Sequence, residues 1–501
     1  MEKIKKKKAL IIGAGSAAKI LILDFRNSRN CNYANNPAKK IDIVGIVDDD
    51  IGKIGTDIDG IKVLGTTRDI EKICAEYNIN LIYFAIPSCS KENRKRILDI
   101  CAKTSLPVRV LPYISEFSEA IKQKPSVMPF VRDLNIADLL GRDPINLDHA
   151  PIKEFIKGKR CLVTGGGGSI GGELVTQIAS CEPELLIILD VYENCAYDVQ
   201  QNLCIEYGNS LNLKTIITTI CDYDKMESVF AEYKLDLVFH AAAHKHVPLM
   251  ETVPDEAVKN NVFGSINVID LAEKYNVKKF VLVSTDKAVN PTNVMGATKR
   301  CCEQYIEAKV MRGSKTEFVI TRFGNVLGSH GSVIPLFMNQ IKKGKPLTIT
   351  DPEMKRYFMT IPEAVSLLLT AAAMANGGEI FVLDMGDAVK IIDLAKNLLI
   401  LNGITPIEGE NYKFTGLRPG EKLYEELFYD LKECDKTSHK KILIERKKIL
   451  TQEQIDTYIK DMEDKLVLLK KAAETTDAGK TVAALKDIVP TFKTVKEKNN
   501  K

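Results

Sequence analysis

Three neighbouring side chains that can exchange protons, Thr285, Asp286 and Lys287, follow the apolar run 279–284. A hydroxyl, a carboxylate and an amine placed side by side can orient a substrate hydroxyl, donate one proton and accept another. The apolar run predicts a buried strand, and open α/β sheets hold their chemistry at the carboxyl ends of strands. We therefore expect acid–base catalysis here. The alternative is a polar strand end with an Asp–Lys surface pair.

A glycine-rich segment indicates a second site. Residues 164–171 read Thr-Gly-Gly-Gly-Gly-Ser-Ile-Gly and directly follow an apolar run, so that the glycines have T-G-x-x-G-x-x-G spacing. Where a strand turns into a helix, such glycines permit a tight turn, let a pyrophosphate approach the backbone and let the helix pack close to the strand. A second apolar run, 185–189, ends in an acidic residue that is placed to bind an adenosine ribose. The residues expected to bind a dinucleotide are Gly165, Gly168, Ser169, Ile170, Gly171 and Asp190. The alternative is a strand–helix turn without a ligand.

Two further pairs extend the expected cofactor site. Asp222 and Tyr223 end the third strand, where an Asp can hydrogen-bond the adenine amino group, and Ala241 and Ala242 are small enough for the backbone to run close to the cofactor. A carboxylate at Asp190 binds two ribose hydroxyls and repels a 2′-phosphate, and the four residues after it include no arginine. The sequence therefore predicts NAD in preference to NADP.

The patterns that position these residues occur in two blocks. Residues 1–111 and 158–430 each alternate strand and helix patterns, which predicts two doubly wound, Rossmann-like parallel-sheet domains of the α/β class in series. A proline-containing connector, 112–157, separates them. After residue 322 the alternation loosens, and we expect a smaller substrate subdomain there, followed by a helical tail over 431–501. The strands expected in the second block are Arg160–Thr164, Leu185–Asp190, Lys214–Cys221, Leu235–His240, Lys279–Ser284 and Glu317–Arg322.

The bulk composition is that of a soluble globular protein, with 501 residues of which 45% are hydrophobic and 27% charged. A net charge of +4 gives no reason to expect a nucleic-acid partner. The 12 cysteines contain no C-x-x-C pair, so we expect no metal site, and their scatter suits a reducing cytoplasm. No apolar run approaches the roughly 18 residues of a membrane span.

Several longer motifs resemble one family. They are His240–Glu251, Ser284–Lys299, Arg322–Gly328, Arg356–Glu363 and Gly416–Lys422. The second block resembles an extended short-chain dehydrogenase/reductase, and more narrowly the polysaccharide-biosynthesis nucleotide-sugar 4,6-dehydratases that act on UDP-N-acetylglucosamine. The first block resembles the CoA-binding-like domain that precedes the catalytic domain in the long members.

One departure from the wider superfamily refines this resemblance. Its usual Tyr-x-x-x-Lys pair appears here as Met295 and Lys299, and a thioether cannot exchange protons. The long 4,6-dehydratases share the methionine, and the branch they form retains configuration at C5. The resemblance therefore implies that Asp286 and Lys287 carry the acid–base work.

The resemblance implies an internal redox reaction. NAD⁺ takes a hydride from sugar C4, water leaves across C5 and C6, and the hydride returns to C6. Thr285 is assigned to the sugar 4-hydroxyl, Asp286 to protonation of the departing C6 oxygen, Lys287 to removal of the C5 proton, and Lys299 to the nicotinamide ribose. A lysine base needs a depressed pKa, which we expect from burial and from the charge of Lys299.

A UDP-sugar needs charge-assisted donors for its diphosphate, and arginine supplies a planar fork. The expected substrate-binding residues are Lys245, His246, Asn325, Arg356 and Arg418, of which Arg356 and Arg418 are the strongest candidates. His246 has a structural role as its alternative.

Two other functions stay open at this point. One is a nucleotide-sugar epimerase on the same scaffold, which normally uses the tyrosine that Met295 replaces. The other is a non-catalytic dinucleotide-binding scaffold. The first block, with Gly13, Gly15, Ala18 and Asp48, fits either a nucleotide site or a packing and regulatory domain.

The resemblance also suggests partners and a location. We expect a homo-oligomer in the cytoplasm. The long members begin with a membrane-embedded segment that would precede residue 1 here. A membrane contact is therefore expected only through such a segment or through the basic start Lys5–Lys8.

Overall fold

A computed structural model describes residues 6–30, 41–104, 106–111, 131–133, 149–426, 434–446 and 450–494. The chain forms two compact units. The first contains residues before 147 together with segments 337–348 and 393–413, and the second contains the remaining residues after 146.

The first unit has a sheet of strand order β3-β4-β2-β1-β5-β6-β7, in which β1 pairs in parallel with β2 and β5. Its strands are β1 (Lys7–Ile12), β2 (Ile41–Val47), β3 (Asp57–Ile58), β4 (Ile61–Gly65), β5 (Leu81–Phe84), β6 (Val108–Val110) and β7 (Arg132–Asp133), and its helices include α1 (Ser16–Asn30), α2 (Ile70–Tyr77) and α3 (Lys91–Lys103). Along β1, Ala9 and Ile11 join one buried cluster, and Leu10 and Ile12 join another. Successive side chains of a strand point to opposite faces, so both faces of this sheet are covered.

The second unit is built on a sheet of strand order β10-β9-β8-β11-β12-β13-β18-β22-β21. The strands are β8 (Arg160–Thr164), β9 (Leu185–Asp190), β10 (Leu213–Ile217), β11 (Leu237–His240), β12 (Lys279–Val283), β13 (Glu317–Arg322), β18 (Ile380–Leu383), β21 (Cys434–Lys436) and β22 (Ile442–Glu445). The order from β10 to β18 is joined by parallel pairs. The predicted pair of Rossmann-like parallel sheets is confirmed.

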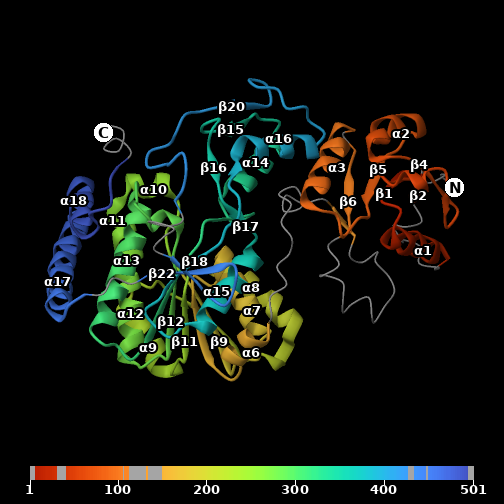
Figure 1. Cartoon of the computed structure of the whole chain (residues 1–501). Helices are drawn as coiled ribbons and strands as arrows, with labels where there is room; N and C mark the ends of the chain where they lie inside the picture. Colours follow the sequence, from red (N-terminus) through yellow and green to blue (C-terminus); the bar gives the residue numbers. More distant parts are fainter. Residues whose placement is uncertain are drawn as a thin grey trace. The chain divides into compact units, whose positions relative to one another are not determined.

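Helices cover both faces of this second sheet, with α9, α12 and α13 on one side and α7, α8 and α15 on the other (Figure 1). The helices of the unit are α6 (Ala150–Ile156), α7 (Ser169–Ala179), α8 (Glu193–Tyr207), α9 (Tyr223–Tyr233), α10 (Val247–Thr252), α11 (Pro254–Ala257), α12 (Ser265–Lys274), α13 (Val294–Met311), α15 (Ile361–Met374), α17 (Gln452–Glu474) and α18 (Ala478–Ile488). Helices α17 and α18 pack on the outer side of α13 through one apolar cluster. None of the helices in the described part of the chain combines the length and the apolar composition that a membrane span requires.

Short elements after residue 322 complete the chain. They are β14 (Asn325–Val326) paired with β17 (Phe358–Met359), β16 (Lys355–Arg356) paired with β19 (Val389–Lys390), β15 (Leu347–Ile349) paired with β20 (Tyr412–Phe414), α14 (Val333–Lys342) and α16 (Ile391–Leu401).

The structure corrects the expected helical tail. Residues 434–446 carry β21 and β22, and β22 pairs antiparallel with β18, so this stretch extends the sheet. The helices start only at Gln452. Most of the expected connector 112–157 lies outside the described residues. The four domain boundaries themselves stay predictions.

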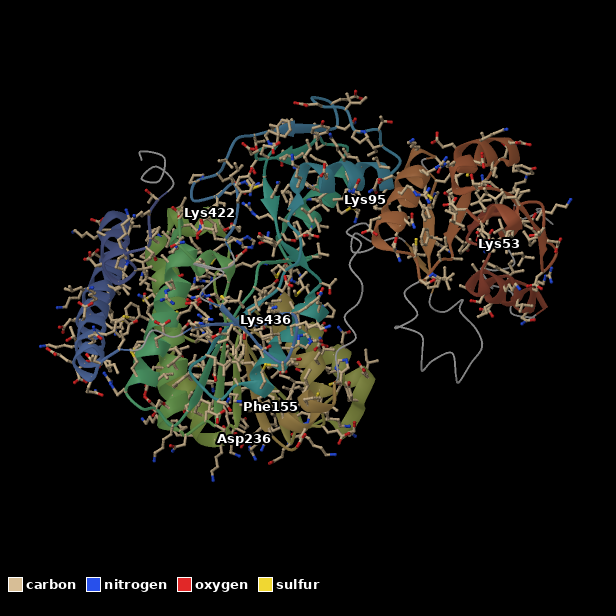
Figure 2. All side chains as sticks on the ribbon, in the orientation of Figure 1. Lys53, Lys95, Phe155, Asp236, Lys422 and Lys436 are labelled. Carbon is tan, nitrogen blue, oxygen red and sulfur yellow. The ribbon has the colours of Figure 1, made fainter. Side chains whose placement is uncertain are left out.

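Residues labelled in Figure 2 mark the two opposite ends of the second sheet. Phe155 and Asp236 mark one end, where Asp236 accepts a hydrogen bond from the Arg160 N–H at 3.0 Å and pairs with Lys278 at 2.7 Å. Lys422 marks the opposite end. Asp236 directly precedes β11, so the Lys422 end is where the parallel strands finish. Ligands of open α/β sheets bind at that end.

A buried ion pair joins β13 to α13 beneath that end. Arg322 donates to Glu303 through Nε at 2.8 Å and through Nη2 at 2.7 Å, and Ser284 donates to the same carboxylate at 2.7 Å. Burial raises the Glu303 pKa, but the charge and hydrogen bonds of Arg322 outweigh burial and bring that pKa down to about 2. The pair therefore fixes the strand end that carries Thr285.

Replacing Glu303 with alanine leaves the fully buried Arg322 cation without its bidentate partner. We expect the free energy of unfolding to fall by about 3 kcal/mol, because the buried Arg322 charge then loses its pair with Glu303 and keeps its ion pair with Glu445. Urea unfolding followed by circular dichroism measures this. The control Glu307→Ala removes a more exposed partner of Arg300 and should cost less than about 1 kcal/mol. Equal effects of the two substitutions would contradict the prediction.

Candidate active site

The glycine-rich turn lies between β8 and α7 and faces the end of β11. Gly165 has a φ of +67°, which favours glycine, and a Cβ there would lie 2.7 Å from the Ala242 backbone nitrogen. A Cβ on Gly171 would lie 1.9 Å from the Gly165 carbonyl oxygen, so α7 packs directly on the turn. The strand order reverses at this turn, because β9 and β10 lie on one side of β8, whereas β11 lies on the other side. This switch point and the close backbone approach fit a dinucleotide.

Asp190 ties the turn to the end of β9. Its Oδ2 accepts the Gly167 N–H and its Oδ1 accepts the Tyr192 N–H, both at 2.9 Å. Asp222 accepts the Lys225 N–H at 3.0 Å and thereby caps α9, which begins at Tyr223. In the structure Asp222 has a helix-capping role, and a contact with an adenine stays a prediction.

Other predicted cofactor residues surround the turn. Ser169 and Ile170 open α7, and the Ser169 hydroxyl accepts the His330 N–H at 3.0 Å. Ala241 and Ala242 directly follow β11, and both are partly buried. The turn is therefore framed by small or short side chains.

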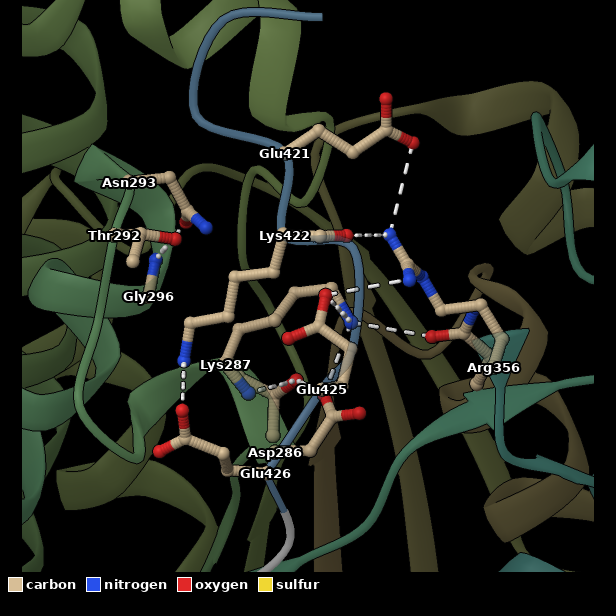
Figure 3. A network of polar contacts seen from close by, with 12 residues as sticks. Asp286, Lys287, Thr292, Asn293, Gly296, Arg356, Glu421, Lys422, Glu425 and Glu426 are labelled. Atoms are coloured by element: carbon tan, nitrogen blue, oxygen red, sulfur yellow. Dashed lines mark hydrogen bonds and ion pairs between the residues drawn. The ribbon is translucent and has the colours of Figure 1, made fainter. Parts of the chain in front are cut away.

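The predicted catalytic triplet lies at the end of β12, and Figure 3 labels two of its members, Asp286 and Lys287. Thr285 Oγ1 donates to Asp286 Oδ1 at 2.9 Å, and Lys287 Nζ donates to the same oxygen at 2.9 Å. Lys287 Nζ also donates to Asn325 Oδ1 at 3.1 Å. The Asp286 side chain is 1% exposed, and its Oδ2 is buried with no hydrogen-bond partner. A buried carboxylate oxygen in this state is suited to a ligand hydroxyl or a transferred proton.

The charge state of Lys287 corrects one expectation. Burial lowers the Lys287 pKa, but the carboxylates of Asp286 and Glu425 outweigh burial, and the pKa is raised above its usual value. The positive charge that opposes them is that of Arg356, whereas we had expected Lys299. The lysine is therefore an ammonium in this structure, and the predicted depressed pKa is wrong.

Arg356 holds a loop, residues 416–426, against the site. Its Nη1 donates to the Leu423 carbonyl oxygen at 3.0 Å, and its Nη2 donates to the Lys422 carbonyl oxygen at 2.7 Å. Its Nε lies 3.8 Å from Glu425 Oε1. In this structure the guanidinium binds backbone and carboxylate and does not present a free fork, which differs from the predicted diphosphate contact.

The other side of this loop is attached to the segment after Lys287. Lys422 Nζ donates to the Val289 carbonyl oxygen at 3.1 Å, and Asn293 Nδ2 donates to the Gly420 carbonyl oxygen at 3.2 Å. Asn293 also caps α13 by accepting the Gly296 N–H at 2.8 Å. The loop thus links the triplet to the start of α13.

Met295 and Lys299 stand one turn apart on α13, and both are buried. Burial lowers the Lys299 pKa. Burial, together with the Lys299 charge, lowers the pKa of His240 to about 3, so this histidine is neutral between Thr164 and Ser265. A buried thioether cannot exchange protons, so Met295 adds no acid or base beside Lys299.

The remaining predicted substrate residues lie on exposed segments. Lys245 and His246 precede α10, and a Cβ on Gly331 would lie 2.4 Å from the His246 ring. Arg418 lies at the exposed start of the loop, where its N–H donates to Glu421 at 3.2 Å. No described contact links these three side chains to Lys287.

Sequence reasoning missed Glu425. The motif 416–422 predicts only Arg418 as a site residue. The buried carboxylate of Glu425 follows three residues after the motif ends. The signal that could have identified Glu425 was its charge, in a loop-like segment next to the motif 416–422.

Two protein-family models match this chain. A model described as polysaccharide biosynthesis protein matches residues 161–447, and one described as CoA-binding domain matches residues 3–112. The chain belongs to the polysaccharide biosynthesis protein family. Within this family it is 45% identical to capsular polysaccharide biosynthesis protein CapD of Staphylococcus aureus, over 85% of this chain and 69% of that protein.

Two further proteins bear on the type of enzyme. UDP-glucose 4-epimerase of Rickettsia canadensis is 41% identical over 54% of this chain and 77% of that protein. The X-ray structure of Pen from Bacillus thuringiensis is 36% identical with a TM-score of 0.54, and covers 58% of this chain and 89% of that one. The proteins similar to this chain thus include one named as a nucleotide-sugar epimerase.

Replacing Arg356 with lysine removes the fork that holds the loop, because an ammonium cannot span the Lys422 and Leu423 carbonyl groups. We expect faster hydrogen exchange of the loop backbone, residues 416–426, measured by mass spectrometry. The control Arg418→Lys changes an exposed arginine of the same loop and should leave exchange unchanged. Equal protection in both variants would remove the assigned role of Arg356.

Proposed function

We propose that this protein is an NAD-dependent 4,6-dehydratase of UDP-N-acetylglucosamine, a hydro-lyase that makes the UDP-4-keto-6-deoxy sugar. The observation that supports it most strongly is the contact set of Thr285, Asp286 and Lys287 together with a buried Met295 at the position of the usual tyrosine. The triplet offers a proton acceptor and a proton donor beside each other, and the thioether offers neither.

The glycine-rich turn fits the proposed cofactor. Gly165, Gly168 and Gly171 would let the pyrophosphate approach, Asp190 would bind the ribose, and Lys299 would contact the nicotinamide ribose. A bound NAD⁺ would supply the hydride chemistry at C4 and C6. A carboxylate at Asp190 disfavours the 2′-phosphate of NADP.

Thr285 and Asp286 form the first proton path. As C4 is oxidised, the proton of the C4 hydroxyl passes to Thr285 Oγ1, whose own proton passes along the 2.9 Å hydrogen bond to Asp286 Oδ1. Asp286 is then a neutral acid and gives this proton to the C6 oxygen, which leaves as water. The proton that leaves the C4 oxygen therefore balances the one that the departing oxygen needs.

Lys287 removes the C5 proton and returns it to the same face, which retains configuration at C5. Because Lys287 is an ammonium in this structure, it must first lose a proton. Protonation of Asp286 assists this loss, since it removes one of the two carboxylates that stabilise the ammonium.

For the substrate, we propose that Lys245, His246, Asn325, Arg356 and Arg418 surround the UDP-sugar. Asn325 is the one of these that contacts Lys287, so we place it against the sugar. Arg356 reaches the diphosphate only if the loop 416–426 shifts, whereas Arg418 is exposed already.

A nucleotide-sugar epimerase is the second candidate, because a relative named UDP-glucose 4-epimerase is 41% identical over 54% of this chain. The buried Met295 argues against it, since the resemblance implies that such epimerases normally use a tyrosine at this position. A non-catalytic scaffold is the third candidate and would leave the triplet without a role.

We further propose a cytoplasmic, homo-oligomeric enzyme whose first domain stays unassigned. Eleven cysteines within the described residues are free thiols, which suits a reducing compartment.

The test is incubation of the purified protein with UDP-N-acetylglucosamine, without added cofactor. A product lighter by one water supports the dehydratase. An unchanged mass with altered sugar stereochemistry would replace it with the epimerase, and inertness of an NAD-loaded protein would favour the scaffold.

Lys287→Ala should lower kcat by about 100- to 10,000-fold, because it removes the general base, and should leave NAD bound. Turnover by mass spectrometry and bound NAD by absorbance measure the two effects. Lys278→Ala, an exposed lysine at the opposite end of the sheet, is the control and should behave as the unchanged protein. Near-normal turnover of Lys287→Ala would exclude Lys287 as the base.

Gly171→Ala should weaken NAD binding by about tenfold or more, because overpacking against the Gly165 carbonyl costs about 1–3 kcal/mol. Calorimetric titration of the NAD-free protein measures this. Gly15→Ala in the first unit adds a methyl group where nothing lies within 4 Å, and should not change NAD affinity. A larger loss from Gly15→Ala would move the cofactor to the first unit.

A further inference from the structure

Glu425 is a buried carboxylate that the proton path above does not use. It comes from the loop 416–426, and its side chain is 3% exposed. Its Oε1 lies 3.7 Å from Lys287 Nζ and 3.8 Å from Arg356 Nε (Figure 3). Its Oε2 is buried with no hydrogen-bond partner. Burying a carboxylate with one oxygen unsatisfied costs free energy, so the position calls for a further explanation.

The groups that face Lys287 differ in what they can accept. Asp286, Glu425 and Asn325 present oxygens to its ammonium, and Arg356 contributes a second positive charge. An amide oxygen is too weakly basic to hold the lysine proton, and a guanidinium has no free acceptor. In the proposed reaction Asp286 already receives the C4 proton. Among the groups facing Lys287, Glu425 is then the carboxylate left to receive another.

We propose that Glu425 accepts the proton that Lys287 must lose before it removes the C5 proton, a role that rests on the proposed dehydratase function. In this step one N–H bond of the Lys287 ammonium breaks and one O–H bond forms on Glu425. The ammonium becomes a neutral amine and the carboxylate a neutral acid, and no charge is gained or lost. Glu425 is thus a positioning residue that acts through Lys287 and does not itself react with the sugar.

The environment makes this transfer accessible. The 3.7 Å separation exceeds a hydrogen bond by less than 1 Å, so a small side-chain movement closes it. A bound sugar that excludes water destabilises the ammonium–carboxylate pair of Lys287 and Glu425 relative to the neutral amine and carboxylic acid, because both ions lose solvation. After C5 is reprotonated, the proton on Glu425 returns to the lysine and restores the starting state.

Glu425→Gln tests the proposal, because glutamine keeps the shape but cannot take the proton. We expect kcat at pH 7 to fall by about 100-fold, with KM changed by less than about threefold. Activity of the variant should rise by up to about tenfold per pH unit from 7 to 9, because the small neutral fraction of Lys287 that solvent provides grows by that factor below its raised pKa. Activity of the unchanged protein should be nearly independent of pH over that range. Glu425→Asp keeps the carboxylate and should keep the flat pH profile at a lower rate.

Glu426→Gln is the matched control. This neighbouring carboxylate faces Lys422 and Asn290, so the same loss of charge one residue along should leave both kcat and the pH profile unchanged. Thermal midpoints of all three variants show whether they fold.

Two results would overturn the proposal. A loss of kcat in Glu425→Gln by the same factor at every pH indicates a purely structural role, and an undiminished kcat at pH 7 shows that the carboxylate is dispensable. Failure of the unchanged protein to dehydrate UDP-N-acetylglucosamine would instead reject the proposed function, so the two failures are distinguishable.

Discussion

The buried contact between Asp286 and Lys287 is the interaction on which the site depends. Lys287 Nζ lies 2.9 Å from Asp286 Oδ1, with side-chain exposures of 17% and 1%, and the Asp286 carboxylate is the first of the charges that raise the Lys287 pKa against the effect of burial. The contact makes Lys287 a cation at rest and leaves one Asp286 oxygen open. Any chemistry at this strand end must therefore begin by changing the charge of one of the pair.

The surrounding structure keeps that pair in place through long-range contacts. Glu303 and Arg322 fix β13 against α13, and Arg356 and Lys422 fix the loop 416–426 against the segment after the triplet. These bonds come from parts of the chain that are far apart in sequence. The parallel sheet supplies the position of each strand end, and the polar bonds supply the orientation of the side chains.

The sequence predicted the strands well because buried parallel strands are nearly continuous apolar runs, such as Leu185–Leu189. It did not predict β21 and β22, because short antiparallel edge strands lack such a run and depend on pairing with β18. It identified Asp286, Lys287 and Asn325 by motif. It missed the Lys287 charge state, the carbonyl contacts of Arg356 and the burial of Glu425, since each depends on which distant segment lies opposite.

The two units show how one scaffold can differ at its switch point. In both, an acid after the second strand accepts a turn N–H, with Asp48 accepting Ala14 at 2.6 Å and Asp190 accepting Gly167 at 2.9 Å. The residues opposite the turn differ. A Cβ on Gly13 would meet the Ile86 side chain at 2.5 Å, whereas the atoms nearest to a Cβ on Gly165 belong to the backbone of Ala241 and Ala242. The Ile86 side chain thus lies beside the first turn where alanine backbone lies beside the second, which agrees with the proposal that the dinucleotide binds in the second unit.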